Sequence, residues 1–496
     1  MNNRRRLFIA SCVALVANAM QFSICTDIMG DFERHFHFTK LELSKAVFGG
    51  AIAGVVVQLL GGALLDILGM GAALWLAAVA QACGVTIIIF AQGSWSLAVG
   101  WTFMAIAGGL IEATINPLAA TEYPDQKTHM LNVLHAWWPG GMIIGGLAAF
   151  GFSAALNAAG ASEHLKAISW QIKMSFVYVP ILLYAVLIFG QKFPKTERAQ
   201  AGVSTEAMFQ EALRPMFLLL VFCMFLTAST ELAPARWVGV FVGDIVKDIT
   251  KDQAAVKPAV SDETRKKLDT NTAVPASTVN VAQEPQDPGK FRGVIVLVYL
   301  SGLMFVLRFF AGPLAKKLSP LGIMIGSAIL SALGLLALSY SGTIFTVFAA
   351  ATVFGIGVTY FWPTMLGITS ERFPKGGALL LGIIGAAGAL FWSYVAAPGM
   401  GKLHDHYTLQ SLSPTITQQV VVKGRVDEDK LKALPNADKK SAQEAVDHAR
   451  KTAASTTFRW VAVFPAVLIV LFGGMFLHDR RRGGYKQEIL TPPSGG

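Results

Sequence analysis

The sequence has little charge: only 15% of its 496 residues are Asp, Glu, Lys or Arg, whereas 53% are hydrophobic. Soluble globular domains carry about a quarter charged residues. The apolar residues fall in nearly uncharged blocks of about 20 or more, the length that a helix needs to cross a bilayer. A chain of soluble domains is therefore excluded, and we predict an all-α polytopic membrane protein.

Cysteines and catalytic motifs are also scarce. The four cysteines lie inside apolar blocks, and their spacing fits neither a zinc site nor an extramembrane disulfide. The sequence contains no P-loop, HExxH, GxSxG or CxxC motif. We therefore expect no metal site, no cofactor and no enzymatic activity.

The basic residues lie beside the apolar blocks. Although the net charge is +10, these residues form no face with interleaved aromatics, so we expect lipid and no nucleic acid as a partner. They gather in the short segments on one side, which predicts a cell-membrane protein with both termini cytoplasmic. The first block is interpreted as a span because its apolar run exceeds that of a signal peptide. The twelve predicted spans are residues 7–29, 43–65, 72–91, 97–119, 132–157, 171–190, 215–243, 293–314, 321–340, 343–366, 377–399 and 458–478.

Two patterns recur along the chain. The segment from Gly62 to Asp66 resembles that from Gly312 to Lys316, 250 residues later. Gly109 precedes Pro117 as Gly355 precedes Pro363, at an offset of 246. An even number of spans separates the copies, so the chain is predicted to hold two six-helix halves in the same orientation, an arrangement typical of transporters.

The predicted organisation follows from this repeat. Residues 1–190 and 214–478 are the two halves, 191–213 a central cytoplasmic loop and 479–496 a cytoplasmic tail. Residues 247–290 and 404–456 are predicted external loops. We expect the first loop to be disordered and the second to hold a short helix around Ala437–Ala453.

Ionisable residues inside spans are functional candidates because they are expensive in a bilayer. Glu112 lies near the middle of the fourth span, one helical turn from Asn116. A carboxyl removed from water can bind and release a proton near neutral pH. Glu112 and Asp27 are therefore candidate proton-coupling residues and Asn116 a candidate solute ligand; the alternatives are a structural hydrogen bond for Glu112 and a solvated boundary position for Asp27.

Glu231 lies centrally in the seventh span. It either binds a hydroxylated solute or pairs with Arg236 or Arg308, and a pair is favoured because an unpaired charge there would be expensive. Arg308 is a gating candidate, with extension to the cytoplasmic interface as the alternative.

The short turn after the second span contains Gly62-x-x-x-Asp66-x-x-Gly69. Glycines allow close helix approach, and the aspartate can pair with neighbouring helix ends. We therefore interpret these three residues as a gating hinge.

Aromatic and amide side chains together suit a sugar, because its apolar ring face stacks and its hydroxyls need donors and acceptors. The alternative is an interfacial belt or helix packing. The candidate solute-binding residues of this kind are His135, Trp138, Tyr360, Trp362 and Trp392.

The chain resembles the major facilitator superfamily and, within it, the fucose-permease-like sugar:proton symporters. The hinge pattern is similar to the superfamily's loop motif, although Met70 and Gly71 stand where basic residues normally follow. The features similar to the subfamily are Glu112-x-x-x-Asn116-Pro117, Leu131-Asn132, Asp27-Ile28, Arg308-Phe309 and Pro363-Thr364. The resemblance implies roles in proton coupling and sugar recognition for Asp27 and Glu112, and places His135 and Trp138 at the sugar cavity.

Our first hypothesis is a monomeric, proton-coupled importer of a small polar solute, most simply a monosaccharide, that works by alternating access. The alternatives are an exporter or exchanger of an organic anion or drug, and a sensor that does not transport. Arg236 and Arg308 in the cavity would favour an anion. Sodium is the alternative coupling ion, since a carboxylate beside an amide can also ligate it.

Overall fold

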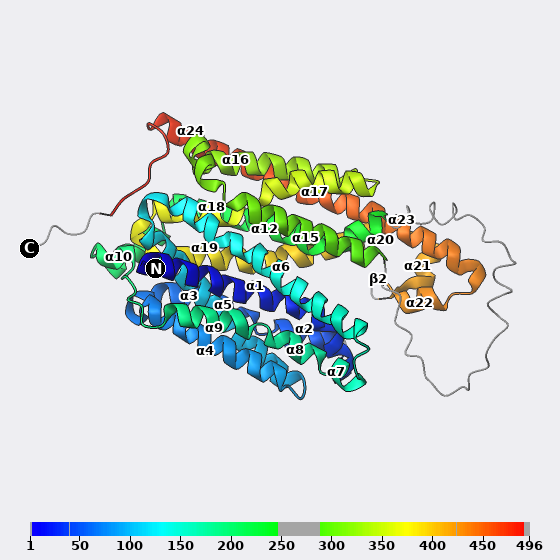
Figure 1. The fold of residues 1–496 in the computed structure, drawn as a ribbon. Helices are drawn as coiled ribbons and strands as arrows, with labels where there is room; N and C mark the ends of the chain where they lie inside the picture. The colour runs from blue at the N-terminus through cyan, green and yellow to red at the C-terminus, as the bar shows by residue number, and fades with distance from the viewer. Residues whose placement is uncertain (1, 39, 247–287, 423, 491–496) are drawn as a thin grey trace, which may run out of the picture.

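The computed structural model describes residues 2–38, 40–246, 288–422 and 424–490. The predicted disordered loop falls mainly on residues 247–287, which lie outside these ranges. Both described chain ends lie at the same end of an elongated helical bundle (Figure 1).

The first half is built from helices that run back and forth along the bundle (Figure 1). Its elements are α1 (Asn3–Phe36), α2 (Lys40–Phe48), α3 (Ala51–Leu68), α4 (Met70–Ile89), α5 (Ser94–Glu122), the 3-10 turn η1 (Pro124–Gln126), α6 (Lys127–Ala158), α7 (Glu163–Ala167), α8 (Ser169–Ser175) and α9 (Tyr178–Ile188). The short helices α10 (Glu197–Gln200) and α11 (Thr205–Ala212) lie in the segment that joins the halves.

The second half repeats this arrangement and adds a folded segment at the end opposite the termini. Its elements are α12 (Pro215–Val246), α15 (Pro288–Arg308), α16 (Ala311–Ser339), α17 (Ile344–Val358), α18 (Phe361–Arg372), the 3-10 turn η2 (Pro374–Gly376), α19 (Gly377–Phe391), the π-helical turn η3 (Trp392–Ala396), α20 (Ala397–Gln410), α21 (Pro414–Val420), β1 (Val421–Val422), β2 (Arg425–Val426), α22 (Glu428–Ala433), α23 (Asn436–Val461) and α24 (Val463–Arg481).

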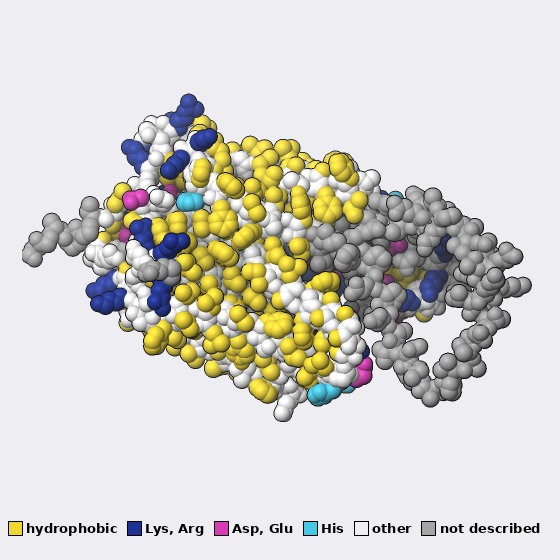
Figure 2. Space-filling view, viewed as in Figure 1, with side chains coloured by type: hydrophobic (Ala, Val, Ile, Leu, Met, Phe, Trp, Pro, Cys, Tyr) yellow, Lys and Arg dark blue, Asp and Glu magenta, His cyan; other side chains and the backbone are white. Residues whose placement is uncertain are grey.

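The described residues contain eleven helical segments long and apolar enough to cross a membrane, and a shorter apolar one, Val298–Arg308. Hydrophobic side chains cover the middle of the face in Figure 2, and Lys and Arg side chains gather at the end that holds the termini. This agrees with the predicted twelve-helix membrane fold.

Several boundaries of the helices and turns recur at a separation of 250 residues. α5 begins at Ser94 and α17 at Ile344, and the turns η1 and η2 begin at Pro124 and Pro374. Even the left-handed backbone recurs: Gly69 has φ of +82° and Ser319 of +61°. The predicted duplication is therefore confirmed, but the 246-residue match of Pro117 to Pro363 is wrong by about one helical turn.

Residues 404–456 fold instead of forming the expected loop. Strand β1 pairs antiparallel with β2, and α23 is longer than the predicted Ala437–Ala453 helix, ending at Val461. An apolar stripe on α23 explains the difference, because Ala442, Val446 and Ala449 recur at helical spacing. These side chains form a separate small core with Leu412, Val420 and Leu431.

Candidate functional site

Glu112, Asn116 and His135 are joined by hydrogen bonds in the first half. The Asn116 amide donates from Nδ2 to Glu112 Oε2 over 3.1 Å and to the Glu112 carbonyl over 2.8 Å. Its Oδ1 atom lies 2.9 Å from His135 Nε2. Asn116 is 1% exposed and His135 2%. Glu112 and Asn116 are neighbours on α5, as predicted, and His135 links this pair to α6.

Glu231 and Arg308 form an ion pair in the second half. Arg308 Nη2 lies 2.8 Å from Glu231 Oε1, and both side chains are less than 5% exposed. The Trp362 backbone N–H donates to the other carboxylate oxygen over 3.2 Å. The predicted pairing with Arg308 is correct, whereas extension of Arg308 to the interface is wrong; the side chain of Arg236 lies outside the described residues.

Two prolines explain how Arg308 is held. Proline has no N–H, so Pro139 and Pro363 each leave the carbonyl four residues earlier without a helical donor. These carbonyls belong to His135 and Thr359, and Arg308 donates to both over 2.7 Å, from Nη1 and Nε. The guanidinium is thus fixed by a carboxylate and by two freed backbone acceptors.

Together these contacts form a polar chain across the two halves. We name Glu112, Asn116, His135, Arg308 and Glu231 the central chain. His135 is the junction, since its ring faces Asn116 and its carbonyl accepts from Arg308 in the other half. Asn116 and His135 therefore connect Glu112 to Arg308 of the second half.

Asp27 lies apart from the central chain. Its Oδ2 atom is 2.6 Å from Lys173 Nζ, the Asp27 side chain is 35% exposed, and that of Lys173 is 8% exposed. The pair ties α1 to α8 within the first half. The structure thus brings together Glu112 and Asn116 but not Glu112 and Asp27, whose proposed coupling role stays a prediction.

The predicted aromatic residues are dispersed around the central chain. Tyr360 donates its hydroxyl to the Leu307 carbonyl over 2.8 Å, beside Arg308. Trp362 reaches the chain through its backbone. Trp138 lies near Phe22, with ring centroids 6.4 Å apart, and Trp392 begins the turn η3 and packs against the main core. Tyr360 and Trp362 therefore adjoin the central chain.

The end of the bundle that carries the termini is closed by contacts between the halves. Thr128 donates its N–H and hydroxyl to Glu371 Oε1 over 3.1 and 2.7 Å. Lys127, which is fully buried, donates to the Ser370 carbonyl and pairs with Glu197 over 2.6 Å. A Cβ atom at Gly367 would collide with Thr128. The beginning of α6 is therefore held against the end of α18.

The chain after α24 adds to this closure. Tyr485 donates its hydroxyl to Glu371 Oε2 over 2.6 Å, and Gln487 reaches the Pro124 carbonyl in the first half. Burial, and then the adjacent Glu371 carboxylate, raise the pKa of Tyr485. The phenol therefore stays protonated and remains a donor.

The predicted hinge lies at this same end. Gly62 and Asp66 lie within the last turns of α3, and only Gly69 follows the helix, so the predicted turn is shorter than expected. Asp66 accepts from Thr196 and pairs with Arg198, which ties the end of α3 to the joining segment. Gly62 lies against the Ala378 carbonyl of the second half, where a Cβ atom would approach within 2.6 Å. Gly69 supplies the left-handed turn, and Gly71 packs against Phe193 at a position where the family motif has a basic residue.

Replacing Asp66 by Ala is expected to loosen the closed end, because Arg198 loses its carboxylate. A cysteine at Ala120, which is buried near the closure, should react with a membrane-impermeant maleimide about fivefold faster in an otherwise cysteine-free Asp66→Ala protein. Arg198→Ala should act alike, and Glu163→Ala, from an exposed pair, should not. If Asp66→Ala and Arg198→Ala both leave the labelling rate of the cysteine unchanged, the gating role of Asp66 is refuted.

Several important residues are not evident from the sequence. In the sequence, Lys127 and Arg198 look like basic residues of short cytoplasmic segments, which indicate only the orientation in the membrane. In the structure both are buried and paired at the closed end. Lys173 likewise appears as a loop charge. A signal does exist for Thr128 and Glu371, since they flank the two similar turns Tyr123-Pro124 and Phe373-Pro374, but their contact joins positions 243 apart.

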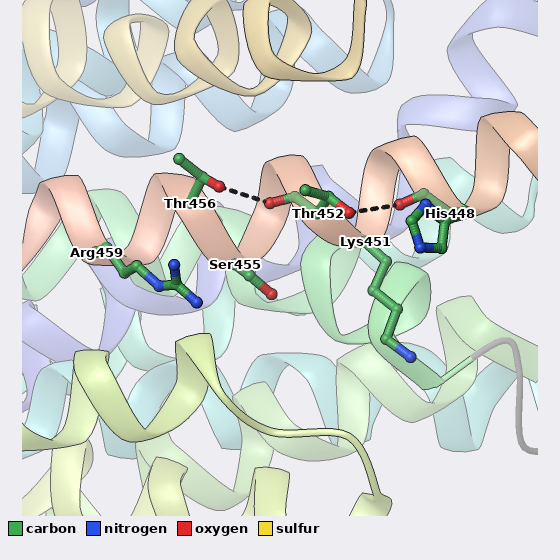
Figure 3. Close-up of a pocket in the computed structure, with 6 residues that line it drawn as sticks. All are labelled: His448, Lys451, Thr452, Ser455, Thr456 and Arg459. Atoms are coloured by element: carbon green, nitrogen blue, oxygen red, sulfur yellow. Dashed lines mark hydrogen bonds between the residues drawn. The ribbon is translucent and has the colours of Figure 1, made fainter. Parts of the chain in front are cut away.

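A surface hollow of about 270 Å³ lies elsewhere, on one face of α23 (Figure 3). Its lining residues are His448, Lys451, Thr452, Ser455, Thr456 and Arg459. Arg459 also stacks over Tyr340, at 4.5 Å from its ring centroid. None of these residues belongs to the central chain, so the hollow is separate from the candidate site.

Comparison with known proteins identifies the fold. Residues 7–246 match the sequence model of the Major Facilitator Superfamily, and no curated protein sequence matches the chain. The structure of the E. coli fucose:proton symporter FucP, as a point variant, is similar with a TM-score of 0.61 at 15% identity, covering 94% of this chain and 99% of FucP. The chain has the major facilitator fold.

Other major facilitator structures are similar to the same extent. The proton:xylose symporter XylE, bound to 6-bromo-6-deoxy-D-glucose, has a TM-score of 0.62 at 12% identity and coverage of 95% for both chains. The human organic anion transporter MFSD10 has a TM-score of 0.58 at 11% identity, covering 95% of this chain and 100% of its own. The predicted resemblance to the major facilitator superfamily, with a fucose-permease-like symporter among the neighbours, is thus confirmed for the fold.

Proposed function

We propose that the protein is a proton-coupled transporter that imports a small, uncharged, polyhydroxylated solute, most simply a monosaccharide, and acts as a monomer. The observation that carries the proposal is Glu112. It is a carboxyl inside the membrane-spanning region that is bonded to a neutral amide, and it has no cationic partner among the residues that the structure describes. A carboxyl in such surroundings can exchange a proton without breaking an ion pair.

An uncharged solute fits the charge balance better than an anion. Arg308 is neutralised by Glu231 and also bonded to two carbonyls. To bind an anion, Arg308 would have to give up contacts that are hard to replace in a buried site. Two structural neighbours are described as fucose:proton and proton:xylose symporters, which adds support for a sugar.

The proposed coupling runs through the central chain. Protonated Glu112 would favour solute binding from outside, and proton release would weaken binding after the closed end opens to the cytoplasm. The termini are taken to be cytoplasmic, in line with the distribution of basic residues. If sodium replaced the proton, its ligands would be the Glu112 carboxylate and, after the amide turns over, the Asn116 oxygen, which faces His135 in this structure.

The second candidate is an exporter or exchanger of organic anions. The observation that favours it is a buried arginine at the junction of the halves, since Arg308 would attract an anion if Glu231 were protonated. The similar fold of an organic anion transporter is compatible with this alternative.

A ligand-stabilisation screen separates these candidates. Purified protein is heated with sugars, organic acids and nucleosides, at pH values above and below 7, and its unfolding temperature is recorded. We expect stabilisation by one or more monosaccharides, because a ligand that binds only the folded state raises stability by about 2.7 kcal/mol at 100 times its Kd. Stabilisation by organic acids alone would reject the sugar proposal and favour the second candidate.

A further inference from the structure

Gln58, in the middle of α3, carries a side-chain amide whose nitrogen has no partner in the described structure. The residue is 5% exposed, and its Nε2 atom has no hydrogen-bond partner in the described structure. A buried donor normally finds an acceptor, because leaving it unpaired destabilises the fold. Such a group therefore points to a second state in which its partner is present.

The 250-residue repeat relates Gln58 to Arg308. The separation of these two positions equals that of the helix boundaries, as between Ser94 and Ile344. The amide is therefore the first-half counterpart of the guanidinium at the centre of the second half. Whereas Arg308 has a carboxylate and two carbonyl partners, Gln58 Nε2 has none.

The residues around Arg308 and Gln58 also occupy positions that the 250-residue repeat relates. The two residues whose carbonyls bind Arg308, Thr359 and His135, correspond to Gly109 and Gly385, and both glycines lie beside Gln58. A Cβ atom at Gly385 would collide with Gln58 Nε2, and one at Gly109 would lie 3.2 Å from the Gln58 backbone nitrogen. Gly385 thus lies against the side-chain amide and offers no side chain to pair with its Nε2 atom, whereas Gly109 lies against the Gln58 backbone.

Gln58 also lies where a solute would meet Glu112. Gly109 precedes Glu112 by three residues, so the two occupy neighbouring positions on one face of α5. Gly385 belongs to the second half, so its contact with Gln58 crosses the seam between the halves. Separation of α3 and α19 would remove the cover that Gly385 provides and expose the amide on a helix that packs against the Glu112 helix α5.

We propose that Gln58 is a solute-binding residue, whose amide donates a hydrogen bond to a hydroxyl oxygen of the solute. An uncharged amide both donates and accepts, which suits hydroxyl groups of a neutral polyol. The inference rests on the proposed function, because it takes the solute to be a monosaccharide. The proposal thus adds a solute-binding side chain on α3, at the first-half position that corresponds to Arg308.

The test compares Gln58→Leu with wild type in proteoliposomes, using radiolabelled L-fucose, D-xylose and D-glucose. For the sugar that wild type transports, we expect KM to rise about tenfold with little change in kcat, the loss of one solute hydrogen bond. Without sugar, the unfolding temperature should stay the same or rise, because an unpaired buried donor has been removed. If Gln58→Leu does not fold, Gln58→Met keeps the length and serves instead.

Gln81→Leu is the matched control. This buried glutamine accepts from Tyr184 over 3.2 Å and donates to Gln21 over 3.5 Å, so its loss should lower the unfolding temperature and leave KM unchanged. A KM for Gln58→Leu within twofold of wild type would overturn the inference while leaving the proposed function standing. Wild type that neither binds nor transports any of the three sugars would overturn both.

Discussion

Replacing Glu112 by Gln is expected to abolish uphill accumulation of the solute. The amide keeps the size of the side chain and a hydrogen bond to Asn116 but cannot exchange a proton. With an imposed gradient of one pH unit, wild type can accumulate solute up to about tenfold through one coupled proton. The variant should reach only the external concentration, as measured by radiolabelled uptake into proteoliposomes.

Exchange at equal pH should survive in the same variant, because it requires movement of the loaded site without net proton transfer. Glu122→Gln is the matched control: it removes a carboxyl from the same helix, at its partly exposed end, and should accumulate solute like wild type. Accumulation by Glu112→Gln would show that coupling does not run through this residue. Loss of exchange together with accumulation would instead indicate that the variant fails to bind solute.

The second large effect is expected at the ion pair of the second half. Glu231→Ala and Arg308→Ala should each destabilise the protein by about 3–5 kcal/mol, because each leaves its partner as a buried uncompensated charge. The double variant Glu231→Leu with Arg308→Met should recover part of this loss, because the charges are gone while the His135 and Thr359 carbonyls still lack their donor. Thermal unfolding in detergent measures the three variants.

The exposed pair of Glu163 and Lys166 provides the control, since its loss should change stability by less than about 1 kcal/mol. If the single variants at Glu231 and Arg308 are as stable as wild type, the pair is not the buried link that we describe. If the loss of stability in the double variant equals the sum of the losses in the two single variants, Glu231 and Arg308 are not energetically coupled.

The sequence predicts much of this molecule because a bilayer restricts the possible structures. Long apolar runs must become helices, and a charge within such a run must be paired or functional. That logic identifies Glu112 and anticipates the pair of Glu231 and Arg308. It also yields the duplication, although prolines that look alike, Pro117 and Pro363, do not correspond in the structure.

Other features depend on contacts that join distant parts of the chain. Nothing local distinguishes the buried Lys127 from a loop lysine, and Gln58 gains its meaning only from the glycines beside it and from its counterpart Arg308. The role of Pro139 and Pro363 is local in origin, since each frees one carbonyl. That both carbonyls meet the same guanidinium follows from the packing of α6, α15 and α18.

The central claim, proton-coupled import of a monosaccharide, is tested most directly by uptake into sodium-free proteoliposomes that contain purified wild-type protein. Radiolabelled L-fucose, D-xylose or D-glucose is supplied outside, with the interior more alkaline. The account predicts that at least one sugar accumulates above its external concentration and that a protonophore abolishes this excess. Uptake that never exceeds the external concentration for any of the three sugars would contradict it. Accumulation that appears only after sodium is added would contradict it as well.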